Sequence, residues 1–444
     1  MWRLGLIGLT LGLVGCQSNP SASPVRTDTL SLSKTSPPPP VPHPYWTDLA
    51  RLLAGIPPKD TFYWREVMRD TVWQNYARRV DYLWSNRRKT LYDSLQVWAA
   101  RELGIYHEWN ETVFYPFSGA DWPTIYFLYP RGKRYIFFGL EQEGDPHELS
   151  RLKPLEIAHS LEGTYATLAD LLRLTFFKTK EMQIQLAHGK VRGLLPVFLA
   201  LLARTGQIIY EVQHIYLRAG GVIDTLSSLQ PKPAQSAWDN PITGLRFVVG
   251  MPDAPLQEVI YLSLNAADAG VKKQIGSYDF LSRLGPCVTL IKSASYLLFS
   301  PEFNEMRKLI LTQSVAILQE DSGIPYRFFD TTAWNIQLYG VYYAPIPLFK
   351  SKYQADLWQA YRKQPVRSLP FGIGYHIPVG TSNLLWAVRK DFRKPLPPIP
   401  VETLRALPVR QLPPPARPDS SMGMSVDSSA QPALPTAVPS GGSE

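Results

Sequence analysis

The chain has 444 residues, of which 46 are Lys or Arg and 37 are Asp or Glu, so its formal net charge is +9. Two cysteines are too few for a disulfide framework, which excludes the small disulfide-rich folds. The positive charge is modest for this length and is spread along the chain. We interpret its three densest spots as solvated surface. They are Arg78-Arg79, Arg87-Arg88-Lys89 and Arg131-Gly132-Lys133-Arg134.

The first 16 residues have the pattern of a secretory signal that ends in a lipid-anchor site. Arg3 precedes an apolar run over residues 4–14, and small residues come before the break. The run is shorter than the roughly 20 residues that a membrane span needs. The sequence Leu13-Val14-Gly15-Cys16 resembles the lipobox of bacterial lipoproteins, whose cysteine is acylated and becomes the first residue of the mature protein.

This resemblance implies that residues 1–15 are a signal peptide and that lipid on Cys16 anchors the protein to a membrane of the cell envelope. Gln17, in place of an aspartate, favours the outer membrane. It does not indicate on which face of that membrane the protein lies. An exported protein meets little nucleic acid, so we expect an envelope protein or a glycan as partner. Acylation of Cys16 leaves Cys287 unpaired. Because Cys287 lies in an apolar, strand-like run, it is interpreted as structural.

Proline-rich segments lie on both sides of the central chain. Residues 16–47 combine proline with serine and threonine, and residues 395–444 combine it with serine, glycine and alanine. Such sequences bury too little apolar surface to offset the entropy of ordering. They predict a disordered tether and a disordered tail.

Residues 48–110 have a helical pattern with an aromatic stripe. Arg87 or Arg88 stands at the step where an apolar residue is missing, which predicts a kink or turn near Ser85-Asn86. We interpret the segment as a helical cap on the following domain. The apolar residues at three- and four-residue steps are Trp73, Ala77, Val80, Trp84, Leu91, Leu95 and Trp98.

Residues 111–394 alternate between strand-like and helical patterns. The strand-like segments are residues 113–117, 135–140, 207–217, 245–249, 259–264, 288–293 and 315–318. The helical patterns cover residues 122–128, 155–177, 182–204 and 302–311. This alternation predicts an α/β fold with a mixed or mostly parallel sheet and covering helices, for which a Rossmann-like arrangement is one possibility.

Several strings in this domain resemble an uncharacterised family of bacterial envelope lipoproteins. The resemblance covers roughly residues 110–390 and implies no activity. The strings that carry it are FYPFSGAD (residues 114–121), residues 135–141, residues 292–296 and LQEDSGIPYR (residues 318–327).

The first string has the outline of a nucleotide-binding half. Gly119 follows a predicted strand and opens a helix, and Glu141 ends the next strand, where it could bind a ribose hydroxyl. This pattern resembles the first two strands of Rossmann-like methyltransferases. The single glycine departs from a G-x-G-x-x-G run. A degenerate or structural use of the loop is therefore favoured, and no cofactor is expected.

A hydrolase interpretation starts from Ser118 with Asp121 and from Ser322 with Asp321. A serine nucleophile needs a base within hydrogen-bond reach, usually histidine. Neither serine stands in a G-x-S-x-G elbow, and spacing selects none of the candidate histidines as that base. A turn is favoured for both serines. The candidate histidines are His107, His147, His159, His188, His214 and His376.

Metal-ligand spacings are missing from the sequence, so no metal site is expected. Glu141, Glu320 and Asp321 could form a carboxylate pair of the kind that glycoside cleavage uses, but nothing in the sequence fixes their separation. The sequence therefore favours a lipid-anchored, non-catalytic binding or structural module. The alternatives are an envelope hydrolase and a degenerate relative of the Rossmann-like methyltransferases.

Overall fold

The computed structural model describes residues 40–174, 184–187, 189–226 and 242–392. The chain divides into two compact units, Met1–Val41 and Pro42–Glu444, and nearly all described residues belong to the second. Cys16, the predicted signal peptide, most of the predicted tether and the predicted tail lie outside the described residues. In the described part of the chain, no helix has the length and apolar character that a membrane span requires.

The residues before the sheet are helical. They form α1 (Pro44–Leu53), α2 (Arg65–Arg69), α3 (Thr71–Arg87) and α4 (Asp93–Glu102). A π-helical turn over Arg88–Tyr92 joins α3 to α4, and such a turn inserts an extra residue into the helical repeat. This insertion accounts for the apolar step that is missing from the sequence near Arg87. The buried members of the stripe are Trp73, Val80, Trp84, Leu91, Leu95 and Trp98.

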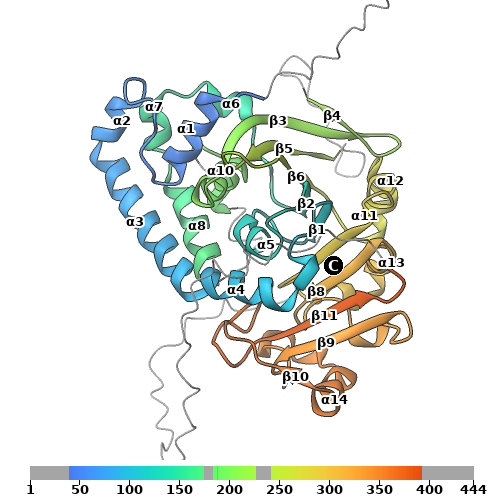
Figure 1. The fold of residues 1–444 in the computed structure, drawn as a ribbon. Helices are drawn as coiled ribbons and strands as arrows, with labels where there is room; N and C mark the ends of the chain where they lie inside the picture. The colour runs from blue at the N-terminus through green and yellow to red at the C-terminus, as the bar shows by residue number, and fades with distance from the viewer. Residues whose placement is uncertain (1–39, 175–183, 188, 227–241, 393–444) are drawn as a thin grey trace, which may run out of the picture. The chain divides into compact units, whose positions relative to one another are not determined.

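Within the described residues, eleven strands form one sheet in the order β10-β9-β11-β8-β7-β1-β2-β6-β5-β3-β4 (Figure 1). Their bounds are β1 Thr112–Pro116, β2 Arg134–Gly139, β3 Ile208–Arg218, β4 Val222–Thr225, β5 Thr243–Gly250, β6 Gln257–Ser263, β7 Cys287–Ile291, β8 Ser314–Gln319, β9 Trp334–Gly340, β10 Val366–Arg367 and β11 Asn383–Arg389. The predicted mixed α/β class is confirmed.

The centre of the sheet is a parallel block, β8-β7-β1-β2-β6. If β1, β2, β6, β7 and β8 are numbered 1 to 5 along the chain, their spatial order read from β6 to β8 is 3-2-1-4-5. This is the order of the doubly wound dinucleotide-binding folds. The order reverses between β1 and β7, where Phe114 pairs with Thr289. Antiparallel pairs extend the block on both sides, through β5 at one edge and β11 at the other.

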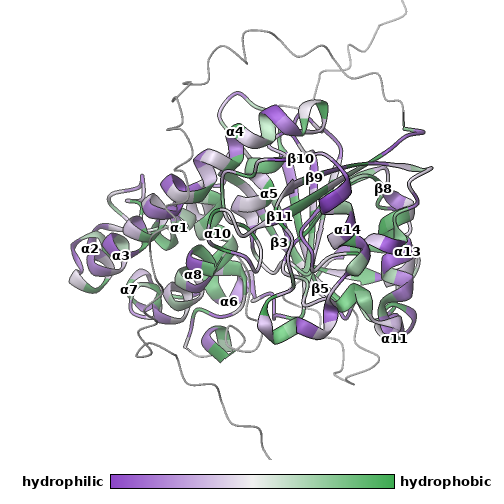
Figure 2. Ribbon diagram, turned by 90° about the horizontal axis from the view of Figure 1, so that it is seen from below, coloured by the Kyte–Doolittle hydropathy of each residue, from purple (hydrophilic) through white to green (hydrophobic). Residues whose placement is uncertain are grey.

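Helices cover both faces of this block, and alternate residues of each strand enter different cores. In β2, Phe137 packs in one core and Phe138 in the other. The first core is shared with α1, α3, α4, α5 (Trp122–Leu128), α8 (Glu162–Leu174) and α10 (Leu195–Arg204). The second is shared with α11 (Asp268–Lys273), α12 (Ser277–Leu281), α13 (Asn304–Gln313) and α14 (Ala355–Lys363). Figure 2 shows the buried α10 mostly green and the outer α3 largely purple.

Some predicted bounds were wrong. The helix predicted over residues 155–177 is split into α7 (Pro154–Ala158) and α8, and α6 (Pro146–Ser150) precedes it. The pattern over residues 182–204 breaks before α10, because Gly193 has a φ of 70° and its backbone lies against Gly144. No sequence pattern predicted β4, β9, β10, β11, α11, α12 or α14.

Candidate functional site

The candidate site lies at the carboxyl ends of β1, β7 and β8. In doubly wound sheets, ligands bind where the strand order reverses, which here is between β1 and β7. The loops that leave these two strands contain non-glycine residues with positive φ: Phe117 (60°), Ser293 (51°), Ser295 (51°) and Tyr296 (54°). Such conformations cost free energy and cluster at functional sites.

A buried ion pair bridges the switch point. Lys292 Nζ, directly after β7, lies 2.5 Å from Asp121 Oδ2, and both side chains are 1% exposed. The Tyr115 hydroxyl donates to the same carboxylate oxygen at 2.7 Å, and the Thr124 hydroxyl donates to Oδ1 at 2.8 Å. Burial lowers the pKa of Lys292, and the contact with Asp121 opposes that shift. The pair therefore ties the loop after β1 to the loop after β7.

Glu320 begins the tight turn after β8. Its Oε1 atom accepts hydrogen bonds from the Ser293 amide, at 2.8 Å, and from the Ser322 hydroxyl. The Ser322 oxygen in turn accepts from the Ala294 amide at 2.9 Å. Burial, followed by the charge of Asp321, raises the pKa of Glu320 well above its ordinary value. The turn of residues 320–322 is thus bonded to the loop after β7.

Asp321 has a different environment although it is the next residue. Its Oδ2 accepts from the Tyr296 hydroxyl at 2.5 Å, and its Oδ1 accepts from Asn383 Nδ2 at 2.9 Å. His376 Nε2 lies 3.5 Å from the same Oδ1. Burial opposes ionisation, but these three contacts outweigh it and lower the pKa of Asp321. Neighbouring carboxyl groups with opposed pKa shifts are a pattern of acid–base and ligand sites.

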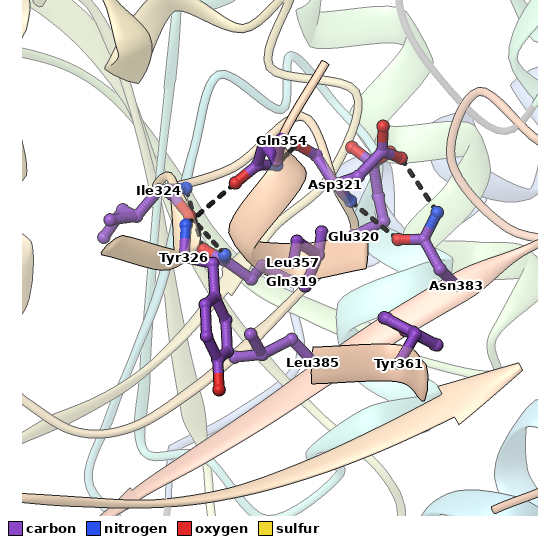
Figure 3. Close-up of a pocket in the computed structure, with 10 residues that line it drawn as sticks. All are labelled: Gln319, Glu320, Asp321, Ile324, Tyr326, Gln354, Leu357, Tyr361, Asn383 and Leu385. Carbon is purple, nitrogen blue, oxygen red and sulfur yellow. Dashed lines mark hydrogen bonds between the residues drawn. The ribbon is translucent and has the colours of Figure 1, made fainter. Parts of the chain in front are cut away.

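A small cavity adjoins this turn (Figure 3). Its volume is about 10 Å³, room for about one water molecule. In Figure 3 the Asp321 carboxylate is turned toward Asn383, and Tyr326 and Leu385 line the opposite side. Across the described ranges, no group of three His, Cys, Asp or Glu side chains is arranged to hold a metal ion.

The two predicted serines donate their hydroxyl hydrogens within their own turns. Ser118 Oγ donates to the Tyr115 carbonyl at 2.7 Å, and Ser322 Oγ donates to Glu320. Neither hydroxyl is bonded to a histidine in the described part of the chain, and His188 lies outside it. The Asp121 side chain contacts Lys292 and not Ser118. The Asp321 side chain contacts His376 and Asn383 and not Ser322.

Gly119 and Glu141 follow the neighbouring strands β1 and β2, and each has a local structural role. Gly119 has a φ of 53°, as a tight turn requires. Glu141 is 2% exposed, and its backbone carbonyl and side chain both accept from the Tyr261 hydroxyl, at 2.7 and 3.4 Å. A Cβ on Gly139 would lie 2.2 Å from Glu141 Oε2, so this side chain is folded back on its own strand.

The sequence did not indicate which side chains contact Asp121 and Asp321. Lys292 and Tyr296 belong to a string that was singled out, but no pattern indicated their role. His376 and Asn383 lie in a region where no element was predicted. The buried Cys287 has its pKa raised to about 11 by burial, as in an unreactive core thiol.

Comparison of the chain with protein-family models, with curated proteins and with solved structures finds no match. The geometry of the site is therefore the basis for a functional proposal.

Proposed function

We propose that the chain is a lipid-anchored protein of the bacterial cell envelope whose α/β domain is a non-catalytic binding or structural module. The lipobox-like sequence that ends at Cys16 supports the anchor. The observation that carries the second part is the buried ion pair between Lys292 and Asp121.

The ion pair matters because of its position. In a doubly wound enzyme, the crevice at the switch point admits the cofactor between the loops of the two central strands. Here Lys292 and Asp121 occupy that position with their own side chains, each 1% exposed. Separating a buried pair leaves charges unpaired, which costs about 3–5 kcal/mol. The arrangement favours a closed crevice over an open one.

The anchor is tested by the Cys16→Ser variant. We expect this variant to leave the membrane fraction, whereas the matched Cys287→Ser variant stays in it because Cys287 is a buried core residue. Cell fractionation with an antibody to the protein measures both. Continued sedimentation of the Cys16→Ser variant with membranes would contradict lipid anchoring at this residue.

The absence of catalysis is tested on isolated cell-wall polysaccharide. The full chain is expected to release no new reducing ends. Release that is abolished by Asp321→Asn, but not by the exposed control Asp391→Asn, would overturn the proposal and favour an envelope hydrolase.

The strand order favours a second candidate, a degenerate relative of the Rossmann-like methyltransferases. Beyond the 3-2-1-4-5 block, β11 runs antiparallel between β8 and β9, as the last strand of those enzymes does. A shared order is a likeness of fold and carries no activity by itself. Equilibrium dialysis with S-adenosylmethionine separates the candidates. Binding that Asp121→Asn weakens would favour the second candidate over a closed crevice.

A further inference from the structure

Glu320 Oε2 and Ser293 Oγ, beside the ion pair, are buried polar atoms without a hydrogen-bond partner within the described ranges. His376 Nε2, 3.5 Å from Asp321 Oδ1, also lacks one. Glu320 is 1% exposed and Ser293 is 9% exposed. Buried polar atoms in folded proteins almost always have partners, so each exception needs a physical reason. A ligand that supplies the missing hydrogen bonds is one such reason.

The two residues belong to one site. The Ser293 amide donates to Glu320 Oε1 at 2.8 Å, so the serine and the carboxyl group are in direct contact. Ser293, Ser295 and Tyr296 all have positive φ, and such strain persists only where the surrounding structure holds it. Strain and unpartnered polar atoms therefore coincide at the carboxyl end of β7.

The three carboxyl groups of this cluster, Asp121, Glu320 and Asp321, have different partners. Lys292 pairs with Asp121, on which the charge of Arg87 also acts, and His376 contacts Asp321. Glu320 is left with a backbone amide and a hydroxyl as its donors. Among the three, Glu320 is therefore the carboxyl group that no basic side chain contacts.

Aromatic rings lie next to Ser293 and Tyr296. The Tyr375 hydroxyl donates to the Ser293 carbonyl at 3.0 Å, and its half-buried ring lies 6.3 Å from Tyr296 at an interplanar angle of 9°. Phe349 lies 5.6 Å from Tyr375. Aromatic faces attract organic cations. The exposed Ser295 is bonded to the Tyr375 hydroxyl, so the Tyr375 side of Ser293 lies near the protein surface.

We propose that Glu320 and Ser293 bind the ammonium group of a primary amine beside Tyr375. The ammonium hydrogens would bond to Glu320 Oε2 and Ser293 Oγ. The inference rests on the proposed function as a binding module and names its ligand class. The ammonium group could belong to a soluble amine or to an amine-bearing lipid headgroup.

Binding should release a proton. Without a cation, burial and the charge of Asp321 raise the pKa of Glu320 and so favour its neutral carboxyl form. The other titratable groups whose charges act with it are Lys292, Tyr115, Tyr296 and Tyr375. When the ammonium group binds, Glu320 gives its proton to the solvent, and the carboxylate balances the charge of the ligand.

Isothermal titration calorimetry of the full chain with methylamine tests this site. In two amine-free buffers of different ionisation enthalpy, we expect about one proton released per amine bound. Glu320→Gln should lower the affinity about tenfold or more, because a hydrogen bond to a charged group is lost. Ser293→Ala should have a smaller effect. Glu141→Gln is the matched control, since Glu141 is equally buried at the end of β2, and should leave the affinity unchanged.

Three outcomes would overturn the site. They are no binding heat at about 10 mM methylamine, equal affinity of the Glu320→Gln and Glu141→Gln variants, and binding without proton release. Circular dichroism checks that each variant is folded. If Glu320→Gln is unfolded, Ser293→Ala decides the test, and an unchanged affinity contradicts the proposal.

Two further measurements are needed. One distinguishes a lipid from a soluble ligand, and the other tests the amine site independently of the proposed non-catalytic function. Flotation of the Cys16→Ser chain, which lacks the proposed lipid anchor, with vesicles of phosphatidylethanolamine and of phosphatidylglycerol distinguishes a lipid headgroup from a soluble amine. Recovery of the methylamine unchanged agrees with a non-catalytic module, whereas its conversion would overturn that assignment and leave the site in place.

Discussion

Asp121 and Glu320 are both almost completely buried on either side of β7, yet their surroundings differ. Between β1 and β7, a lysine contacts Asp121 at 2.5 Å and two hydroxyl groups saturate its oxygens. Between β7 and β8, Glu320 has only uncharged donors, and its second oxygen has no partner in the described structure. A cation in contact favours the ionised form of a buried acid, whereas burial among uncharged donors next to another acid favours the neutral form.

The largest effect should come from breaking the ion pair. Lys292→Met leaves Asp121 buried and unpaired, so we expect the free energy of unfolding to fall by about 3–5 kcal/mol. Urea denaturation measures this loss. Lys190→Met is the control, because the exposed Lys190–Glu156 pair at 2.6 Å should be worth at most about 1 kcal/mol. Equal losses in the two variants would show that the buried pair has no special role.

Removing the tyrosine hydroxyl that is bonded to Asp121 or to Asp321 should have an intermediate effect on stability. Tyr115→Phe removes the 2.7 Å bond to Asp121, and Tyr296→Phe removes the 2.5 Å bond to Asp321. Each is expected to lower the free energy of unfolding by about 1.5–3 kcal/mol, as for hydrogen bonds to charged groups. The exposed Tyr82→Phe should change it by less than about 0.5 kcal/mol. Thermal or urea unfolding of the three variants compares them, and a Tyr115→Phe variant as stable as Tyr82→Phe would contradict a stabilising hydrogen bond from Tyr115 to Asp121.

The smallest effect is a pH dependence at Glu320. Its pKa is raised on folding, so the stability it contributes is complete below its ordinary value of 4.5 and is lost as the pH rises through the folded-state pKa. Relative to the natural protein, Glu320→Gln should become more stable with rising pH, by at most about 1.4 kcal/mol per unit. Urea denaturation at several pH values measures the difference.

Glu258 provides the opposite control. Burial opposes its ionisation, but Arg246 and Arg134, each at 2.5 Å, lower its pKa. The stability that Glu258 contributes is therefore present above pH 4.5, its ordinary pKa, and is lost as the pH falls through its folded-state pKa. A Glu320→Gln profile with the same sign as the Glu258→Gln profile would mean that Glu320 is ionised in the folded protein.

Local patterns in the sequence predicted much of the central sheet. β1, β2, β6 and β7 are short apolar runs bounded by turn residues, because strands buried on both faces need apolar side chains at every position. β9 has exposed or half-buried polar residues such as Asn335 and Gln337, so its apolar signal is weak. β11 was missed for a different reason, because it is an apolar and mostly buried run in a stretch where no element was predicted.

The site could be predicted only in part. Ser118, Asp121, Asp321 and Ser322 were singled out as turn residues after strands, and the structure places all four at the carboxyl ends of β1 and β8. Their partners were not predictable from spacing, since Lys292 is 171 residues from Asp121 and Asn383 is 62 residues from Asp321.

By itself, the sequence determined the α/β class, the positions of the central strands and the turn chemistry at their ends, because periodicity and turn preferences are local properties of the chain. The pairing of Lys292 with Asp121 and the isolation of Glu320 were decided by the tertiary structure alone. Both depend on β7 lying between β1 and β8, and strand order is set by packing over long separations rather than by neighbouring residues.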